Sequence, residues 1–224
     1  MRAMILAAGR GERMGALTQH TPKPLLEVNG KYLIEYAIEN LVRAGIFEIA
    51  INLSYHSEQI KSVLGDGKRY DISIFYSEEE ERLETGGGIF KALPFFEKDP
   101  FLVLSSDIIT DYPLSQLPPS PKGLAHLVLV NNPPYHPRGD FGLANGLLSL
   151  AAQPSFTFSN IGVYRPELFA ACEAGHFPLS QLLLPAIAAG QLTGEYYSGL
   201  WFNVGTAKDL VLVNESMLLP LQVT

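Results

Sequence analysis

The sequence predicts an α/β fold in which helices flank a mostly parallel central sheet. Short apolar runs alternate with stretches of helical spacing in the first half, and the stretch from Leu33 to Val42 ends before a helix-stopping Gly45. Strands are expected at residues 2–7, 48–53, 72–76 and 101–104, with helices at 33–42, 58–64 and from residue 88 onward. Because this alternation is typical of parallel strands joined by crossover helices, both faces of the sheet should be covered.

The second half has a different character. Four prolines between Asp111 and Gly123 indicate a surface loop, and Asn145-Gly146 between apolar residues predicts a hairpin within 141–150. Further strands are expected at 125–130 and 156–164, a strand and loop at 193–203, and helices at 166–173, 179–190 and 207–219. No linker is long enough to separate two domains, so residues 1–224 are expected to form one domain with halves at 1–110 and 111–224.

Composition and charge limit the classes of function. The chain has 224 residues, 47% apolar and 17% charged, which excludes collagen, coiled coil and low-complexity disorder. A prior of about 150 residues per domain fits one domain with a small appended subdomain. The net charge of -7 argues against nucleic acid or an anionic membrane as a partner, although one local phosphate pocket is compatible with it.

Cysteine content and the first residues address the compartment. Cys172 is the only cysteine, which excludes an internal disulfide or a multi-cysteine zinc site and indicates a reducing compartment. The apolar run after Met1 is too short for a signal peptide or a membrane span. We therefore expect a cytoplasmic, soluble protein, monomeric by default. The acidic run 78–81 is expected to be a solvated loop.

Two glycines follow the first expected strand. Gly9 and Gly11 let the backbone turn sharply, and the amides of such a turn can converge on phosphate oxygens. Arg13 could then pair with a phosphate tail. The pattern lacks the Gly-Lys-Ser/Thr ending of a P-loop and the third glycine of a dinucleotide fingerprint. Taken alone, it is also the pattern of a plain strand-to-helix turn.

A constrained lysine follows this turn. Lys23 stands between Pro22 and Pro24, which fix their own φ angles, and Pro24 also restricts Lys23 to an extended conformation. A solvated surface lysine needs no such constraint, whereas a lysine aimed at a phosphate benefits from it. The five histidines are scattered without metal or triad spacing, and we expect structural or surface roles for them.

Five motifs are spread along the chain. They are Leu6-Ala7-Ala8-Gly9-x-Gly11-x-Arg13-Met14, Pro22-Lys23-Pro24, Leu83-Glu84-Thr85-Gly86-Gly87-Gly88, Gly139-Asp140-Phe141-Gly142 and Trp201-x-x-Val204-Gly205-Thr206. Together they resemble one family, the sugar-1-phosphate nucleotidyltransferases. The resemblance extends from residue 1 to about residue 217. It implies a Rossmann-like, GT-A-like nucleotidyltransferase fold with a small sugar-binding β-hairpin subdomain. The halves 1–110 and 111–224 would bind nucleotide and sugar, respectively.

The resemblance also implies a reaction. Such enzymes join a nucleoside triphosphate to a sugar-1-phosphate and release pyrophosphate, with Mg²⁺ as the cofactor. Softer features favour the branch that transfers uridylyl from UTP to N-acetylmuramate α-1-phosphate in peptidoglycan recycling of the cell wall. Thymidylyl, guanylyl or cytidylyl transfer to another hexose-1-phosphate is the enzymatic alternative.

The roles of individual residues are implied by the same motifs. The nucleotide would be bound by Leu6, Ala7, Ala8, Gly9, Gly11, Glu84, Gly86 and Gly87, and the sugar by Asp140, Gly142 and Asn160. The catalytic residues would be Arg13 on the triphosphate, Lys23 on the transferring phosphoryl group and Asp107 on the metal. Gly86 and Gly87 are expected to let the base approach the backbone.

The sequence departs from the family pattern at two positions. Ser106 precedes Asp107 where the family usually has glycine, and Asn203 stands where the family has a second metal-binding aspartate. An amide oxygen can bind Mg²⁺, but the lost carboxylate predicts a weaker metal site. These departures leave open a non-enzymatic alternative, a nucleotide-sugar sensor that binds nucleotide without releasing pyrophosphate.

Overall fold

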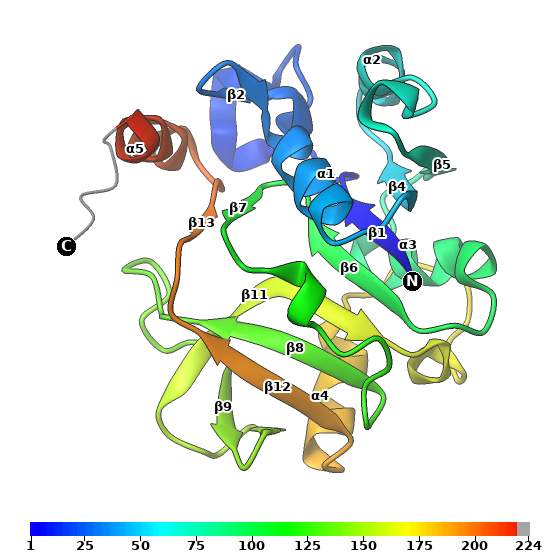
Figure 1. Cartoon of the computed structure of the whole chain (residues 1–224), viewed down its shortest axis with the longest axis vertical. Coiled ribbons are helices and arrows are strands. Elements are labelled where there is room, and N and C mark those ends of the chain that lie inside the picture. Colours follow the sequence, from blue (N-terminus) through cyan, green and yellow to red (C-terminus); the bar gives the residue numbers. More distant parts are fainter. Residues whose placement is uncertain (219–224) are drawn as a thin grey trace.

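The computed structural model describes residues 1–218, and a nine-stranded mixed sheet forms the centre of this part of the chain (Figure 1). In spatial order the strands are β5 (Ser73–Glu78), β4 (Glu48–Leu53), β1 (Arg2–Leu6), β6 (Phe101–Ser105), β11 (Ser155–Tyr164), β8 (Ala125–Val130), β12 (Leu192–Tyr197), β10 (Leu147–Ser149) and β9 (Phe141–Ala144). The order places the first four strands of the sheet in the N-terminal half of the sequence.

Parallel pairing dominates this first half. β1 lies between β4 and β6 and is parallel to both, and β5 is parallel to β4. The helices α1 (Leu33–Arg43) and α2 (Ser57–Leu64) pack on one face with Ala3 and Ile5, whereas α3 (Glu84–Phe96) packs on the other face with Met4. The central strand is apolar on both faces because both faces are covered, as the sequence predicted.

The second half of the sheet is mostly antiparallel. β11 is antiparallel to β6, β8 and β9, and β9 and β10 form the hairpin that Asn145-Gly146 predicted. Only β12 is parallel to its neighbour β8 in this half. The helix α4 (Ser180–Ala188) packs on the same face of the sheet as α3. Antiparallel strands can be joined by tight turns, whereas parallel strands need long crossover connections. The crossover helices therefore belong mainly to the first half.

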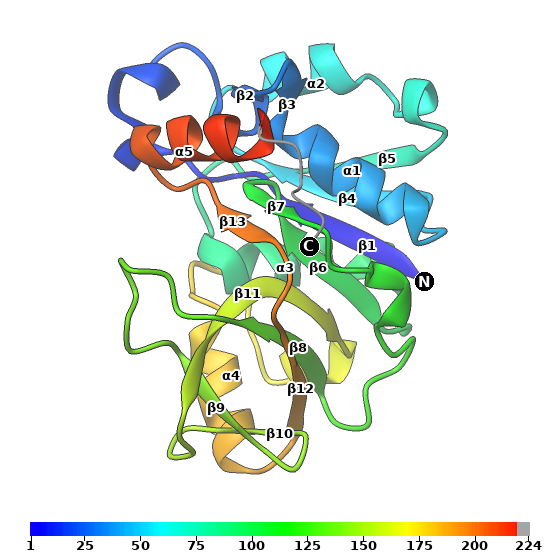
Figure 2. The same cartoon turned by 60° about the vertical axis from the view of Figure 1, so that its left-hand side comes forward.

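The chain returns to its N-terminal half at the end. β13 (Trp201–Asn203) pairs antiparallel with β7 (Ile108–Thr110), outside the main sheet. The helix α5 (Ala207–Leu218) then packs beside the segment Glu12–Thr18 that follows β1, close to the hairpin of β2 (Glu27–Val28) and β3 (Lys31–Tyr32) (Figure 2). Val213 and Met14 are buried in the core that these segments share.

The helix α1 shows how the local sequence forms an element. Its apolar residues recur at helical spacing and are fully buried, including Ile34, Ile38 and Leu41. The Glu35 carboxylate accepts a hydrogen bond of 2.8 Å from the N–H of Tyr32 and so caps the first turn. The chain leaves the helix through Gly45, whose φ of 75° is left-handed.

Three expected helix boundaries need correction or limits. The predicted helix at 166–173 is wrong, because only a short 3₁₀ segment Pro166–Phe169 forms there. The helix expected from residue 88 begins at Glu84. The last helix is present, but Leu219 lies outside the described residues.

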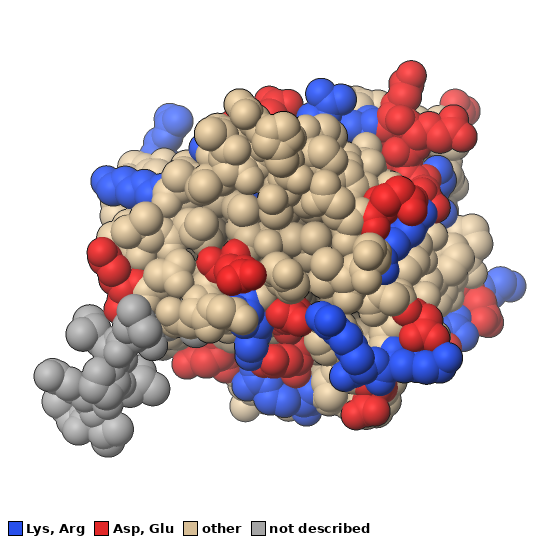
Figure 3. Space-filling view, turned by 90° about the horizontal axis from the view of Figure 1, so that it is seen from above, with Lys and Arg blue, Asp and Glu red and all other residues tan. Residues whose placement is uncertain are grey.

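Charges of both signs are interleaved on the surface. On the face drawn in Figure 3, Lys and Arg side chains stand beside Asp and Glu side chains around the rim, and uncharged residues fill most of the centre. Lys61, for example, pairs with Glu58 and Glu78. Among residues 1–218, no helix combines the length and the apolar character that crossing a bilayer requires.

Candidate active site

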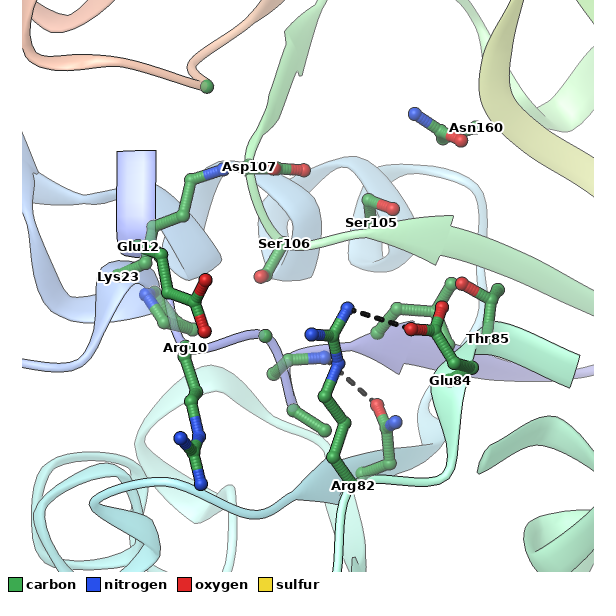
Figure 4. Close-up of a pocket in the computed structure, with 18 of the residues that line it drawn as sticks. Arg10, Glu12, Lys23, Arg82, Glu84, Thr85, Ser105, Ser106, Asp107 and Asn160 are labelled. Atoms are coloured by element: carbon green, nitrogen blue, oxygen red, sulfur yellow. Dashed lines mark hydrogen bonds and ion pairs between the residues drawn. The ribbon is translucent and has the colours of Figure 1, made fainter. Parts of the chain in front are cut away.

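A cavity of about 550 Å³ opens at the carboxyl ends of β1, β4 and β6 (Figure 4). Ligands gather at this edge in open α/β sheets. Its lining brings together eleven of the residues singled out in the sequence: Leu6, Ala7, Ala8, Gly9, Gly11, Arg13, Lys23, Glu84, Asp107, Asn160 and Asn203. Their assigned roles remain predictions, but they converge on this cavity from six separate segments of the chain.

The turn after β1 requires glycine at one of its two positions. Gly11 has a left-handed φ of 67°, and a Cβ there would lie 2.9 Å from the methyl group of Thr18. The Thr18 hydroxyl donates a hydrogen bond of 2.9 Å to the Gly11 carbonyl and so holds the turn. A Cβ on Gly9 would meet nothing within 4 Å. Gly9 therefore leaves the backbone open on the cavity side.

Lys23 reaches the cavity from a rigid segment. Pro22 has φ -64°, and the 3₁₀ turn Lys23–Leu25 begins directly after it, so the expectation that Pro24 keeps Lys23 extended is wrong. Lys23 is 9% exposed, and its ammonium group forms an ion pair with the Asp107 carboxylate (Figure 4). Burying a lone ammonium group is costly, so Asp107 stabilises the buried charge. The amine is held in the cavity before any ligand arrives.

Asp107 and Asn203 are brought together by the small β7–β13 ladder. Asp107 lies in the turn between β6 and β7, where its carbonyl accepts a hydrogen bond of 2.9 Å from Val204 N–H. Asn203 in β13 pairs with Ile108 in β7, and Ile108 directly follows Asp107 in the sequence. The Asn203 side-chain oxygen is buried and has no hydrogen-bond partner among the described residues. Asp107 and Asn203 thus line the same cavity, and the buried amide oxygen of Asn203 is available to a ligand that can reach it.

These two oxygen donors fit a magnesium ion whose remaining ligands are phosphate oxygens and water. Mg²⁺ prefers oxygen and is often held by one or two protein groups together with phosphates and water. The described side chains contain no cluster of three or more His, Cys, Asp or Glu residues that could form a metal cage. The pair Asp107 and Asn203 therefore suits an ion that arrives with a phosphate ligand.

A buried network under the cavity was missed by the sequence analysis. The Asn52 side chain accepts a hydrogen bond of 2.9 Å from Ala7 N–H and donates one of 2.7 Å to Glu79. Glu79 also accepts a hydrogen bond of 3.0 Å from Leu83 N–H. The network ties the turn after β1 to the start of α3. The expectation of a solvated acidic run is wrong for Glu79, which is 5% exposed.

Three arginines line this cavity together with Lys23, and the acidic residues Glu12, Glu79, Glu84 and Asp107 balance their charge. Arg10, Arg13 and Arg82 all line it, and only Arg13 was predicted. The guanidinium group of Arg13 lies against Gly205, where a Cβ would be 3.3 Å from Nη2. Arg82 forms an ion pair of 3.2 Å with Glu84 (Figure 4). The sequence signal for Arg10 was present, since it stands between the two glycines of the turn.

A second cavity of about 370 Å³ adjoins the first. Thr85, Asn160 and Asn203 line both cavities, so the two share a wall. Asn160 has a left-handed φ of 60° at a bulge in β11, where the register with β8 shifts. Such a bulge re-aims a side chain and stops regular pairing. The second cavity extends from this bulge toward α4 and the β8–β9 loop.

Comparison with known proteins decides the family. A family model described as Nucleotidyl transferase matches residues 2–146, more than half of the chain. The chain belongs to this nucleotidyl transferase family. It is 44% identical over 219 residues to an N-acetylmuramate alpha-1-phosphate uridylyltransferase of Neisseria meningitidis serogroup B, covering 92% of this chain and 94% of that relative.

More distant nucleotidyl transferases extend the comparison. A mannose-1-phosphate guanyltransferase of Aspergillus fumigatus is 31% identical across 94% of this chain, which spans 62% of that longer relative. A crystal structure of a putative glucose-1-phosphate thymidylyltransferase from Bacillus anthracis has a TM-score of 0.85 at 22% identity, covering 96% and 94% of the two chains. The structural likeness confirms the expected GT-A-like nucleotidyltransferase fold.

Gly86 and Gly87, which were expected to contact the nucleotide base, do not line the first cavity of this nucleotidyl transferase. A Cβ on Gly86 would lie 2.5 Å from the Phe177 ring, and one on Gly87 would lie 2.2 Å from the Gly175 carbonyl. The Gly87 N–H donates a hydrogen bond of 3.1 Å to the Phe177 carbonyl. The absent side chains make room for another segment of the chain, and the contact of these glycines with a base stays a prediction.

The predicted sugar residues separate in a similar way. Asp140 and Asn160 line the second cavity, whereas Gly142 lines neither cavity. A Cβ on Gly142 would lie 2.1 Å from the Ala152 carbonyl, so this glycine serves packing of the hairpin. A role of Gly142 in binding the sugar stays a prediction.

Proposed function

We propose that this chain transfers the uridylyl group of UTP to N-acetylmuramate α-1-phosphate and releases pyrophosphate. The observation that carries the chemistry is the convergence of the glycine turn, Lys23 and Asp107 on one cavity with an adjoining second cavity. The choice of substrates is supported by the relative that is 44% identical across 92% of this chain. One cavity is suited to the triphosphate and the other to the sugar.

The proposed reaction needs no general base. A phosphate oxygen of the sugar-1-phosphate attacks the α-phosphorus of UTP, and the bond from that phosphorus to the β-phosphate oxygen breaks. The attacking phosphate has a second pKa near 6 and is largely ionised at neutral pH. Catalysis then consists of positioning the reactants and stabilising charge on the transferring group.

The residues of the first cavity suit these two tasks. Backbone amides of the turn from Ala7 to Gly11 can bind phosphate oxygens. Lys23 holds its ammonium group in place for the transferring phosphoryl, because its segment is rigid and Asp107 orients it. Arg10, Arg13 and Arg82 supply charge for the triphosphate tail.

We propose that Asp107 and Asn203 hold a Mg²⁺ ion. The orphaned oxygen of Asn203 and the neighbouring carboxylate are the observation in support. When bound, the ion would offset the negative charge of the phosphates. With one protein carboxylate instead of two, its affinity should depend strongly on the phosphates that share it.

The two halves of the chain would divide the substrates. In this proposal residues 1–110 bind the nucleotide and residues 111–224 the sugar, with Asp140 and Asn160 on the sugar side. We also propose that the chain acts as a monomer in peptidoglycan recycling in the cytoplasm.

Pyrophosphate release tests the proposal directly. The purified protein would be mixed with Mg²⁺, one sugar-1-phosphate and each nucleoside triphosphate in turn, with EDTA as the control. Release with UTP and N-acetylmuramate α-1-phosphate is expected. Release only with another pair would replace the substrates and keep the reaction. Nucleotide binding without release from any pair would contradict the enzymatic proposal and support a sensor.

A further inference from the structure

The second cavity contains one side chain that can carry positive charge. Among its lining residues, only Tyr135, His136 and Asp140 are titratable. Tyrosine and aspartate cannot become cations, whereas an imidazole can near neutral pH. The apolar part of the lining is Phe141, Phe158, Pro178, Leu179, Leu183 and Trp201. His136 is therefore the only lining group that could offset the charge of an acidic sugar.

The ring of His136 is held by a neighbouring carboxylate. Nε2 lies 3.0 Å from Oδ1 of Asp140, and Oδ2 of the same carboxylate accepts a hydrogen bond of 2.8 Å from Phe158 N–H. Both oxygens of Asp140 are thus engaged. Among the described residues, Nδ1 of His136 has no hydrogen-bond partner. It is the nitrogen left to donate to a ligand.

The loop that carries His136 has a defined structure. The His136 N–H donates a hydrogen bond of 2.8 Å to the Pro133 carbonyl, and the His136 carbonyl accepts one of 3.1 Å from Gly139 N–H. Asn132 donates a hydrogen bond of 3.0 Å to the Ser155 carbonyl and so anchors the loop to β11. Figure 2 shows this β8–β9 loop rising from the sheet toward the segment around α5.

We propose that His136 selects sugar phosphates that bear a carboxylate, and that Asp140 is the positioning residue for its ring. The proposal rests on the proposed function, whose sugar differs from N-acetylglucosamine by a lactyl ether that ends in a carboxylate. A carboxylate loses bound water when it enters a binding site, and in a protein of net charge -7 it then needs a charged hydrogen-bond donor. When it is protonated, the imidazole held by Asp140 supplies one, and a sugar without the acid gains nothing from it.

The experiment measures a ratio of kcat/KM values with UTP. The ratio divides the kcat/KM for N-acetylmuramate α-1-phosphate by the kcat/KM for N-acetylglucosamine α-1-phosphate, which lacks the lactyl group. His136→Gln should lower this ratio by about two- to fivefold, the range for a charge pair that solvent partly reaches. The change should appear in KM for the acidic sugar, because its carboxylate does not react.

Three further variants separate charge from structure. His136→Arg keeps a cation and should retain most of the ratio. Asp140→Asn keeps an acceptor for Phe158 N–H but loosens the ring, so an intermediate ratio is expected. His20→Gln makes the same replacement at an exposed histidine that lines neither cavity, and it should keep the wild-type ratio. Thermal unfolding of each variant reports whether the loop change damages the fold.

The outcomes distinguish the two proposals. A wild-type protein without preference for the acidic sugar would overturn the proposed substrate and this inference with it. A wild-type preference that persists in His136→Gln would overturn the inference alone. Loss of the ratio in both the glutamine and arginine variants would also overturn it, because charge would then not be the cause.

Discussion

Lys23 and Asp107 are 84 positions apart in the sequence and meet in the cavity. The two partners of this ion pair differ in solvent exposure, since the Lys23 side chain is 11% exposed and the Asp107 side chain is 22% exposed. Water can therefore reach Asp107 more readily than Lys23. Removing the lysine leaves a carboxylate that solvent can partly stabilise, so activity should suffer more than stability.

Lys23→Ala should lower kcat for pyrophosphate release by a factor of about 10² to 10³, the range for losing one stabilising group of a transition state. The melting temperature should change by only a few degrees, as measured by circular dichroism. Lys68→Ala, at a lysine whose side chain is 87% exposed, is the matched control. Wild-type turnover in the Lys23 variant would remove it from the proposed mechanism.

Asn203→Asp should strengthen metal binding, because a second carboxylate would join Asp107 in the same cavity. The Mg²⁺ concentration for half-maximal activity should fall by roughly tenfold. Mn²⁺ binding followed by electron paramagnetic resonance gives an independent reading. Asn145→Asp, in the exposed hairpin turn, adds the same charge away from the cavity. Equal metal dependence in wild type and Asn203→Asp would contradict the expectation.

Individual site residues could be predicted where the backbone itself signals a role. Glycines mark the turn from Gly9 to Gly11, and prolines flank Lys23, so the sequence signals a special backbone at both places. Both line the cavity. Gly87 and Gly142 were assigned to ligands, yet their Cβ positions are blocked by the chain itself. A sequence shows that a close approach is needed, but the approaching group is known only once the fold is.

At the scale of elements, predictions succeeded where burial pattern and length agreed. The four strands expected in the first half formed within two residues of their expected bounds, whereas the short strands β2, β3 and β7 were not predicted. The stretch 166–173 failed as a helix although it begins with a suitable proline. Glu79 was misjudged because its partners Asn52 and Leu83 come from other elements. Partners across elements are invisible to local pattern.

The packing of α3 gives a prediction in which two effects oppose each other. Helix propensity alone predicts that Gly87→Ala stabilises the helix by about 1 kcal/mol. The new Cβ would lie 2.2 Å from the Gly175 carbonyl, and such overpacking destabilises by about 1–3 kcal/mol. We expect the clash to dominate, with a lower free energy of unfolding in urea.

Gly175→Ala is the matched control on the other side of the same contact. A Cβ at Gly175 would meet nothing within 4 Å, so its effect should stay within about 0.5 kcal/mol. A Gly87→Ala protein as stable as wild type would show that the 175–177 segment yields readily.

For the whole molecule, buried tyrosines predict a limit of stability at high pH. Burial raises the pKa of Tyr112, whose hydroxyl donates to Glu195, and burial with a hydrogen bond to Asp111 raises the pKa of Tyr197 to about 12. Above pH 10 the unfolded chain loses these protons first. The free energy of unfolding should therefore fall as pH rises from about 10 to 12.

Tyr112→Phe tests this explanation. The variant should lose about 1–2 kcal/mol at pH 7 with the Glu195 hydrogen bond. Between pH 10 and 12 its free energy of unfolding should fall less steeply than that of wild type, by up to about 1.4 kcal/mol per pH unit. Urea unfolding across pH measures both. Identical slopes would mean that other groups cause the alkaline loss.

The global arrangement was only partly accessible from the sequence. Alternating strands and helices predicted the α/β class and the covered first half. The pairing of β11 with β6 could not be predicted, because it joins strands about 60 positions apart without a local signal. That pairing makes one sheet of the two halves, and the second cavity lies beyond it.

This unbroken sheet also determines how molecules can enter and leave. Opening the two halves by a hinge would require breaking the ladder between β6 and β11, where Leu102, Leu104, Ile161 and Val163 are fully or almost fully buried. Such a hinge would lose the hydrogen bonds of this ladder and expose these side chains, so we expect the halves to stay together. The β8–β9 loop, which carries His136, lies at the rim of the second cavity. We therefore expect product release to depend on a loop motion and not on a domain motion.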